Sequence, residues 1–392
     1  MQLQEPEGSL RRNETINISK DLMSLTIGIG PNIRKSAYFD STLRDGVQSF
    51  SVYNHMLIPG HFGDPEGEYD RLLNSVAQWD VAAQRQVQMQ GTDAGKLAQY
   101  LTPRDLTKTK VGQGRYVPLC DHQGWLINDP VLLKLSEETY WLSVADSDIH
   151  LWAAAIAQER GWDVRVTEPD VSPMAIQGPK AIDVAERLFG TMVYDLKNFG
   201  FIETTLNGIP LVLAKSGWSK QSGFEFYLRD SAKGAALWGV VKEAGQPFGI
   251  GPGAPNDIER LESGLISYGA DIRWQHYPAT PYEIGLGGLV NLEAGHEFIG
   301  RAALEAAHNS GPKRQRVGLV LDGTPAFPGH PCPVLRGSDE IGYVSEFAYS
   351  KRVGRTIGVG LVTLAHTGTG TNVMIELPYG TVAARIRKIP FV

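Results

Sequence analysis

The sequence predicts an α+β fold that ends in a separate β domain. Strand-like and helix-like segments follow one another in mixed order, which favours α+β over a doubly wound parallel sheet. Residues 306–392 are different, because their short apolar runs are divided by Gly, Pro and Asp. That pattern is typical of a closed or sandwiched β structure. A chain of 392 residues has room for two or three domains with a large core.

The individual elements follow from hydrophobic periodicity and from turn residues. Residues 1 to about 40 form a loosely patterned arm. The patterns then predict an amphipathic helix over residues 66–78, a strand with Val87 and Met89 on one face, and a helix carrying Leu97 and Leu101. A three-strand meander over 114–148 and a helix through Ile149 and Ile156 follow. The remaining elements are two strands and a helix over 164–190 with Pro179 in the first helical turn, two strands over 208–228, and helices over 232–243 and 256–264.

Composition excludes several classes of function. The net charge of −6 and the absence of a Lys/Arg run argue against nucleic acid and against an anionic membrane surface. No apolar stretch is long enough to span a membrane, and the polar N-terminus lacks the apolar core of a signal peptide. Cys120 and Cys332 define neither a metal motif nor a disulfide framework. We therefore expect a cytoplasmic protein.

Gly-rich and His-containing segments do not indicate a nucleotide or metal site. The clusters at Gly28, Gly249 and Gly368 do not lie between a clear strand and a helix with a suitably spaced acidic residue. The nine histidines are scattered, and no HExxH or Cys/His spacing is present. We expect no metal.

One carboxylate interrupts an apolar run. Asn128 and Asp129 divide "GWLINDPVLLKL" at its middle, where the chain would otherwise continue as a buried strand. A charge among buried side chains is costly unless it is paired or used. The alternative is ordinary turn chemistry, since Asp before Pro130 favours a turn.

A second constellation lies in "GWSKQSGFEFYLRD". If residues 223–229 form a strand, Glu225 and Tyr227 share one face, and Trp218 joins them from the preceding turn. Aromatic rings and a carboxylate on one wall suit a flat heterocycle with N–H donors. An exposed strand face is the alternative. Arg260 lies within a predicted helix, where a solvated charge is the simpler interpretation.

Taken in order, these segments resemble the glycine-cleavage T-protein (aminomethyltransferase) family, whose members bind tetrahydrofolate. The resemblance covers nearly the whole chain after about Ser49 and rests on many motifs in family order: "WDVAAQRQVQMQGTDAGKLAQYLTPRD", "VGQGRYVPLCDHQGWLINDPVLLKL", "MAIQGPKA", "SGFEFYL", "ERLESGLISYGADI", "TPYEIGLGGLV", "FIGRAAL" and "RKIPFV".

The resemblance implies a three-domain cloverleaf with folate in its central opening. Residues 1–60 with 150–240 would form a first α+β domain, and residues 61–149 with 241–305 a second, approximately. Residues 306–392 would form a C-terminal β-barrel-like domain. The oligomeric state stays open, a homodimer included.

The resemblance also implies roles for individual residues. Asp129 matches the family's catalytic aspartate, Glu225 the glutamate that grips the pterin, and Arg260 a ligand-side arginine. Two groups of pocket residues complete the expected site: for folate Phe199, Trp218 and Tyr227, and for the substrate Tyr53, His55, Met56, Trp218 and Lys220. The aromatic rings of Tyr53 and Trp218 suit an onium ion, and Lys220 is a donor for a substrate carboxylate.

Departures from the T-protein pattern favour one branch of the family. Asn128-Asp129 replaces the usual aspartate pair, Ala145 stands where an asparagine is general, and Ser219 begins an altered turn. "SVYNHMLIP", "QWDVAAQRQV", "INDPV" and "GWSKQSGFE" together resemble the dimethylsulfoniopropionate demethylases. That resemblance implies transfer of an S-methyl group from a small sulfonium substrate to tetrahydrofolate. The alternatives are another N-, O- or S-methyl donor, aminomethyl transfer, or a non-enzymatic folate-binding role, which the lack of Cys in 219–224 disfavours.

Overall fold

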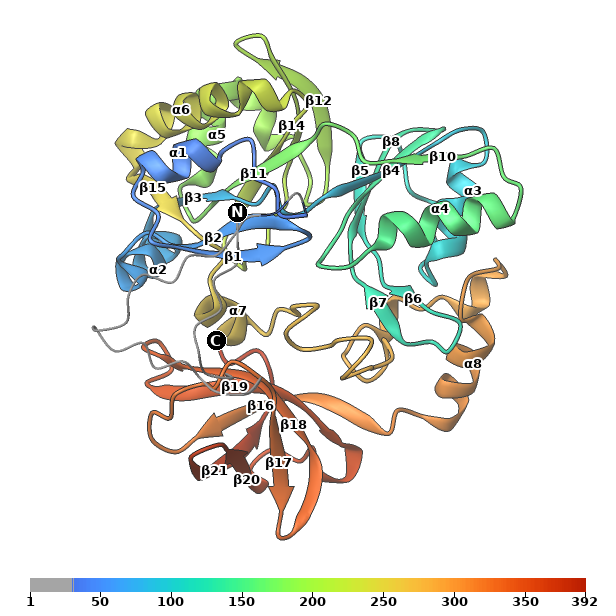
Figure 1. The fold of residues 1–392 in the computed structure, drawn as a ribbon, viewed down its shortest axis with the longest axis vertical. Coiled ribbons are helices and arrows are strands. Elements are labelled where there is room, and N and C mark those ends of the chain that lie inside the picture. Colours follow the sequence, from blue (N-terminus) through green and yellow to red (C-terminus); the bar gives the residue numbers. More distant parts are fainter. Residues whose placement is uncertain (1–29, 31) are drawn as a thin grey trace.

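The computed structural model describes residue 30 and residues 32–392. The chain forms three lobes, two α+β lobes side by side and a β-barrel below them (Figure 1). Helix α7 and the C-terminus lie where the lobes meet. Most of the predicted N-terminal arm falls outside the described residues, although Phe39–Arg44 form helix α1. The cloverleaf and the α+β class are confirmed.

The first lobe is built on a six-stranded sheet of order β12-β13-β14-β11-β3-β15. All neighbours are antiparallel except β15, which runs parallel to β3. The strands are β3 (Val76–Asp80), β11 (Ser172–Gln177), β12 (Phe201–Leu206), β13 (Ile209–Ala214), β14 (Gly223–Leu228) and β15 (Ile250–Gly253). The helices of this lobe are α1, α2 (Pro65–Asn74), α5 (Ala181–Phe189) and α6 (Gly234–Gly245), with the hairpin β1 (Ser49–Tyr53) and β2 (Met56–His61) beside them.

The second lobe is built on a five-stranded antiparallel sheet of order β10-β4-β9-β8-β5. Its strands are β4 (Gln86–Gln90), β5 (Gln113–Tyr116), β8 (Val131–Ser136), β9 (Thr139–Ser143) and β10 (Arg165–Thr167), and its helices are α3 (Ala94–Leu101) and α4 (Ile149–Glu159). A separate small hairpin, β6 (Leu119–Cys120) with β7 (Leu126–Asn128), precedes β8. The predicted meander is therefore real, but a hairpin is inserted in it.

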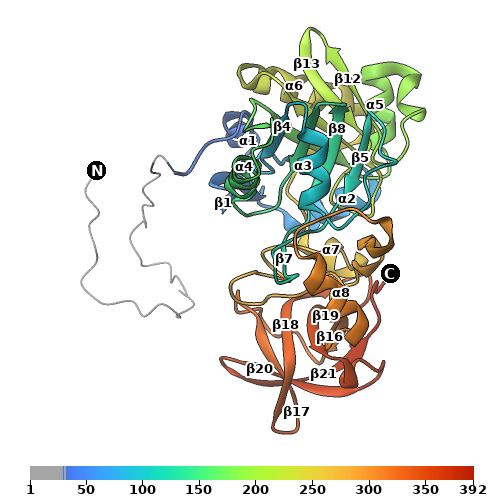
Figure 2. The same cartoon turned by 90° about the vertical axis from the view of Figure 1, so that its right-hand side faces the viewer.

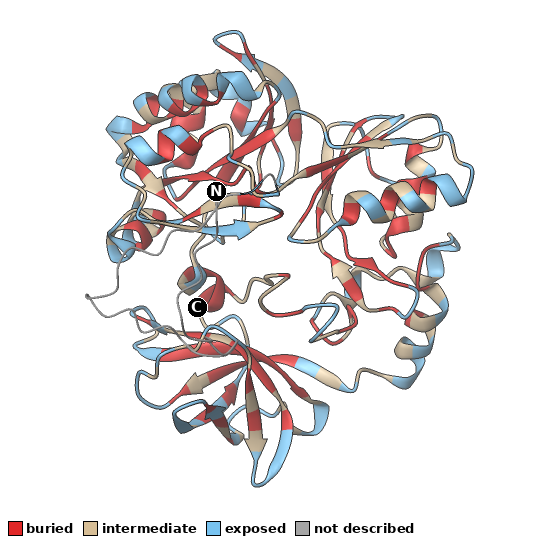
Figure 3. Cartoon of the chain, in the orientation of Figure 1, coloured by how far each residue is buried: buried red, intermediate tan, exposed pale blue. Residues whose placement is uncertain are grey.

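The two sheets pack face to face between two layers of helices. On β14, Phe224 and Phe226 enter the core under α5 and α6, whereas Tyr227 points the other way. There it meets Leu133 and Trp141 of the second sheet. The far face of the second sheet is covered by α3 and α4. Buried residues accordingly run along the strands of both sheets (Figure 3). We call the contact surface between the two sheets the seam.

The C-terminal lobe is a closed barrel of order β16-β19-β18-β17-β20-β21. Its strands are β16 (Arg314–Leu321), β17 (Cys332–Arg336), β18 (Asp339–Ser350), β19 (Arg355–Thr363), β20 (Asn372–Leu377) and β21 (Gly380–Arg387). Helix α7 (Asp257–Ser263) places Leu261 on the outer face of the barrel, against Ile357 and Val359. Figure 2 shows α7 and α8 (Arg301–Ser310) between the barrel and the upper lobes.

Short 3₁₀ helices complete the described chain: η1 (Gly190–Tyr194), η2 (Ser231–Lys233), η3 (Gln246–Phe248), η4 (Gly287–Leu289), η5 (Leu292–Ala294) and η6 (Leu364–His366).

Several sequence predictions need correction. The helix predicted over 66–78 ends at Asn74, and Val76 and Trp79 belong to β3, because the apolar residues at the end of the pattern are a buried strand. Pro179 lies just before the N-cap Lys180 and not in the first turn of α5. The predicted domain boundaries also differ from the observed lobes. Strand β3 falls in the range predicted for the second domain but belongs to the first sheet, and α4 falls mostly in the range predicted for the first domain but packs on the second sheet.

Candidate active site at the seam between the two sheets

Asp129 lies in the break between β7 and β8, as the interruption of the apolar run predicted. Its carboxylate Oδ2 accepts a 2.7 Å hydrogen bond from the hydroxyl of Tyr116, which ends strand β5. The side chain is only partly exposed. The carboxylate is thus held by a defined donor at the end of the second sheet, and is neither a free surface charge nor sealed in a core.

The surroundings of Asp129 favour its neutral form. Burial raises the pKa of Asp129 to about 7, and the charge of Asp271 adds to the rise, while the Tyr116 hydrogen bond opposes it. Burial, followed by the charge of Asp129, likewise raises the pKa of Tyr53 above its ordinary value. The charge of Asp129 therefore acts on the Tyr53 hydroxyl. A carboxyl group that titrates near neutrality is suited to exchange a proton.

Asn128 fixes the backbone on which Asp129 stands. Its amide nitrogen donates to the carbonyl of Ala145 at 3.0 Å and to Ser147 Oγ at 2.8 Å. Its amide oxygen accepts the N–H of Ala145 at 3.1 Å. Asn128 is fully buried, so these bonds replace those it would make with water. Because adjacent side chains of an extended chain point to opposite sides, anchoring Asn128 directs Asp129 away from it.

The tip of the β1–β2 hairpin is pinned to the same loop. The Asn54 side chain donates to the carbonyls of Ala83 and Val144 at 3.0 and 3.1 Å. Its backbone N–H donates to Asp146 at 2.7 Å, and its side-chain oxygen accepts the N–H of Ser147 at 3.1 Å. This buried residue, with φ of 50°, ties the hairpin tip that follows Tyr53 to the second lobe.

The structure does not bring the other two predicted hairpin residues to the site. His55 lies on the surface, 3.4 Å from the exposed Asp148. Met56 is buried in the core of the first lobe with Val76 and Met174. Asn54 and His55 both have left-handed backbone conformations, with φ of 50° and 61°, at the turn between the two strands.

Glu225 lies on the seam from the side of the first sheet. Its Oε2 accepts hydrogen bonds from the hydroxyl of Ser216 and from that of Tyr227, the latter at 3.2 Å. Burial raises the pKa of Glu225, while both hydroxyls oppose the rise. Both donors bind Oε2, and no hydrogen bond to Oε1 is present within residues 30 and 32–392. Oε1 is thus the acceptor that a ligand would find.

A row of paired residues connects the two carboxylates. Tyr116, Val131 and Ser143 are direct neighbours across β5, β8 and β9, so their side chains share one face. That face is the seam, where Val131 packs against the buried cluster that contains Tyr227. Asp129 and Glu225 are therefore presented by facing sheets along one surface.

Phe199 is held in a strained conformation at the edge of this surface. Its φ of 60° is uncommon for a bulky residue and costs free energy unless its surroundings compensate. Its N–H donates to the carbonyl of Lys215 at 2.9 Å, and its own carbonyl accepts the N–H of Gly114 at 2.6 Å. A side chain at Gly114 would stand 3.0 Å from that carbonyl, so glycine allows the close approach.

Trp218 is half-buried in the loop before β14 and donates from Nε1 to the carbonyl of Ile266 at 3.2 Å. The loop that follows is tied down by the backbone N–H of Lys220, which donates to Glu259 at 3.0 Å. The Lys220 side chain itself is exposed. The loop thus connects the seam with residues 265–268 above the barrel.

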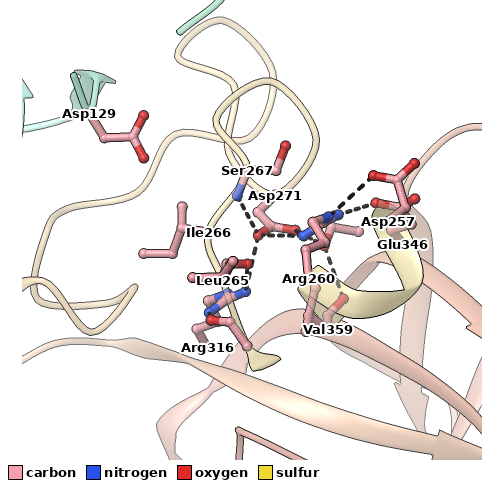
Figure 4. A network of polar contacts seen from close by, with 12 residues as sticks. Asp129, Asp257, Arg260, Leu265, Ile266, Ser267, Asp271, Arg316, Glu346 and Val359 are labelled. Atoms are coloured by element: carbon pink, nitrogen blue, oxygen red, sulfur yellow. Dashed lines mark hydrogen bonds and ion pairs between the residues drawn. The ribbon is translucent and has the colours of Figure 1, made fainter. Parts of the chain in front are cut away.

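Arg260 is placed differently from its prediction as a ligand-side arginine. Its guanidinium is fully buried and binds Asp271 at 3.1 Å and also Glu346 of the barrel. Asp271 is shared with Arg316 at 3.2 Å and accepts the N–H of Ser267 at 3.1 Å. Figure 4 shows this network, with Ile266 between it and Asp129.

The two arginines compensate the charge of Asp271. Although burial would raise the pKa of Asp271, the two arginines bring it below its ordinary value. Arg260 therefore stands in a structural ion-pair centre that joins α7, the 265–271 loop and the barrel. These contacts leave it little to offer a ligand directly.

Sequence reasoning missed Tyr116 and Asn54. Tyr116 lies in the quoted motif before Asp129, but the two strands of a hairpin separate them in the sequence, so the pattern gives no sign that they are in contact. Asn54 follows the predicted Tyr53, and only its left-handed backbone and its bonds to the second lobe show its role. In the part of the chain that the structure describes, no group of three His, Cys, Asp or Glu side chains is placed to hold a metal, and no helix is long and apolar enough to cross a membrane.

Comparison with known proteins agrees with this architecture. Residues 39–294 match the model of the GCVT N-terminal domain, and residues 314–392 match the glycine cleavage T-protein C-terminal barrel domain. The chain is similar to dimethylsulfoniopropionate demethylase DmdA of Ruegeria pomeroyi, with 40% identity over 91% of this chain and 96% of that protein. An aminomethyltransferase of Listeria monocytogenes is 29% identical over 85% of this chain and 91% of its own length.

A solved structure shows the same fold. The aminomethyltransferase T of the glycine cleavage system from Bartonella henselae superposes with a TM-score of 0.78 and 23% identity, covering 92% of this chain and 98% of that one. The two family models match residues 39–294 and 314–392, which is most of the chain. The chain therefore belongs to the glycine cleavage T-protein family.

Proposed function

We propose that this protein is a tetrahydrofolate-dependent demethylase that transfers a methyl group from dimethylsulfoniopropionate to tetrahydrofolate. The products are methylmercaptopropionate and 5-methyltetrahydrofolate. The observation that carries the proposal is the 40% identity with the Ruegeria demethylase over 91% of the chain, against 28–30% for three bacterial aminomethyltransferases. Two buried free cysteines agree with a reducing, cytoplasmic setting.

The reaction needs alignment more than acid catalysis. The methyl carbon forms a bond to N5 of the folate as its bond to sulfur breaks, and the electron pair of that bond stays on sulfur. The leaving group is a neutral thioether, so no general acid has to protonate it. Holding the three atoms in line contributes roughly 7–11 kcal/mol at best.

Asp129 is suited to the charge that the transfer moves. Positive charge passes from sulfur to N5, which then loses its proton. A carboxylate at this place stabilises that charge, and a pKa of about 7 lets it accept the proton directly or through water. Tyr116 keeps the carboxylate in one orientation and limits the rise of its pKa. Tyr116 therefore joins the site as a positioning residue.

The seam offers what a reduced pterin requires. The free Oε1 of Glu225 is an acceptor for pterin N–H groups, and its Oε2 is held by Ser216 and Tyr227. Half-buried Phe199 and Trp218 add aromatic surface for a flat ring. We assign the pterin to these residues, and we assign Arg260 to the support of the 265–271 loop instead of direct contact.

The sulfonium substrate would lie between Tyr53 and Trp218. Aromatic faces attract onium ions, and Tyr53 stands close enough to Asp129 for the two to influence each other. The exposed Lys220 amine is the candidate partner for the substrate carboxylate. His55 and Met56 have no part in this assignment, given their positions on the surface and in the core.

Product analysis with purified protein tests the proposal. Incubation with dimethylsulfoniopropionate and tetrahydrofolate should yield 5-methyltetrahydrofolate and methylmercaptopropionate in equal amounts. A panel of betaine, methoxy and other sulfonium donors should give much slower transfer. Activity only with an aminomethylated lipoyl carrier, with release of ammonia, would identify an aminomethyltransferase instead. Folate binding without turnover of any donor would reject an enzymatic role.

A further inference from the structure

A basic pocket lies on the outer surface of the barrel. It encloses about 320 Å³, a volume at the lower end of the range for small-molecule sites. Its lining combines basic and apolar side chains from three barrel strands, the β18–β19 turn and the C-terminal segment: Val320, Asp322, Val353, Arg355, Arg385, Arg387, Lys388, Pro390 and Phe391.

The register of the barrel explains why the basic side chains converge. Arg385 and Arg387 are two residues apart on β21, so both point outward from the barrel, whereas Ala384 and Ile386 point into its core. Val320 of β16 pairs with Arg385 and forms the floor between them and β19. Arg355 enters from the start of β19.

The C-terminal segment forms a fixed wall. The N–H of Phe391 donates to the carbonyl of Glu262 at 2.8 Å, which ties the segment to α7. The Phe391 ring lies over Gly318, where even a methyl group would stand 2.6 Å from it. Gly318 thus makes the room that lets the ring close one end of the pocket.

The charges of this pocket are not balanced by the described protein. Asp322 is the single acidic residue in the lining, against four basic ones. Within residues 30 and 32–392, none of Arg355, Arg385, Arg387 and Lys388 makes an ion pair or a side-chain hydrogen bond. Elsewhere on the barrel, Arg314 and Arg316 are paired with carboxylates. Like charges held together repel one another, and an anion would relieve the repulsion.

We propose that this pocket binds a small organic phosphate. Arginine forks match phosphate oxygens, so Arg385, Arg387 and Arg355 would hold the phosphate group. Val320, Val353 and Phe391 offer an apolar surface for the remainder of the ligand. The site is separate from the seam and does not depend on the function proposed for it.

Three matched probes test the site by calorimetric titration at low ionic strength. Phenyl phosphate has both the charged phosphate group and an aromatic ring, inorganic phosphate has the charge alone, and phenol has the ring alone. We expect phenyl phosphate to bind at least about tenfold more tightly than inorganic phosphate, and phenol not to bind measurably. No binding of phenyl phosphate to the wild-type protein would overturn the proposal, and so would equal binding of the two phosphates.

Paired variants locate the binding. R385Q/R387Q should weaken phenyl phosphate at least about tenfold, while K180Q/R187Q, a matched exposed pair on the first lobe, should leave it unchanged. F391L should bring the affinity for phenyl phosphate down to that for inorganic phosphate. Unaltered binding in R385Q/R387Q would place the phosphate elsewhere. Competition between phenyl phosphate and tetrahydrofolate would show that the pocket belongs to the folate site, which also contradicts the proposal.

Discussion

Asn128 and Ala145 are joined by reciprocal hydrogen bonds, from the Asn128 side chain to the Ala145 carbonyl at 3.0 Å and from the Ala145 N–H back to the Asn128 oxygen at 3.1 Å. These are the two positions at which the chain departs from the T-protein pattern next to the predicted catalytic residue. The two departures meet in space, and their contact sets the backbone that carries Asp129.

Asn128→Asp should damage this contact. A carboxylate cannot donate to the Ala145 carbonyl or to Ser147, and it would add a buried charge beside Asp129. We expect the free energy of unfolding to fall by about 2–3 kcal/mol in urea titrations at pH 8. Asn309→Asp, on the exposed side of α8, is the matched control and should change it little. Equal stability of the two variants would show that the reciprocal bonds contribute nothing.

The pH dependence of turnover should report Asp129. Because burial raises the pKa of Asp129 to about 7, its carboxylate is mostly protonated below that pH and mostly ionised above it. If the ionised form is the active one, kcat/KM rises with pH through about 7. Asp129→Asn should lower kcat by about a hundredfold or more and abolish this rise. An unchanged pH profile in the variant would exclude Asp129 as its origin.

Asp129 should also make stability depend on pH. The folded-state pKa lies above the ordinary value of 3.8, so between about pH 4 and pH 7 the native state binds the proton more tightly than the unfolded chain. Stability therefore falls as pH rises through that interval. We expect Asp129→Asn to be more stable than the wild type by about 1–2 kcal/mol at pH 8, with no gain at pH 4. Chemical denaturation at both pH values measures the difference, and a gain at pH 4 would contradict it.

Tyr116→Phe separates positioning from catalysis. Its hydroxyl lowers the pKa of Asp129, so removing it should move the rise in kcat/KM to higher pH by about one unit. Activity at pH 8 should fall while folate affinity stays close to that of the wild type. Tyr349→Phe, an exposed residue of β18, serves as the control. A loss of activity without a displaced pH profile would point to a purely structural effect.

Glu225→Gln tests the pterin contact. An amide is a weaker acceptor than a carboxylate, so the dissociation constant of tetrahydrofolate should rise about tenfold to a hundredfold. Fluorescence or calorimetric titration gives this constant without turnover. Glu243→Gln on the exposed face of α6 should leave it unchanged. The same affinity in both variants would remove Glu225 from the folate site.

Arg260→Met should lower the free energy of unfolding, since Arg260 is assigned to the support of the 265–271 loop and not to a ligand contact. Loss of the guanidinium leaves Asp271 and Glu346 buried with less compensation, at a cost of about 3–5 kcal/mol. Asp271→Asn should also destabilise the protein, since it removes the shared partner of Arg260 and Arg316. Arg187→Met, exposed on α5, is the control. Normal stability together with weakened folate binding would instead support the ligand-side role predicted from the sequence.

The sequence by itself determined the family, the classes of element and the faces of β14. Alternation placed Phe224 and Phe226 opposite Tyr227, and the structure confirms it, because the direction of side chains in a strand follows from backbone geometry alone. The break at Asp129 was readable for a similar reason, since an ionisable group inside an apolar run breaks a local rule. Short strands divided by turn residues likewise predicted the barrel.

Only the tertiary structure decided which partners these residues meet. Tyr116 reaches Asp129 because a two-stranded hairpin brings β5 and the break together. Arg260, predicted to contact a ligand, lies at the centre of an ion-pair network, and Met56, predicted to contact the substrate, is buried in the core of the first lobe. Such contacts join segments far apart in the chain, and local periodicity carries no record of them. Their energies depend on burial and on charge in three dimensions.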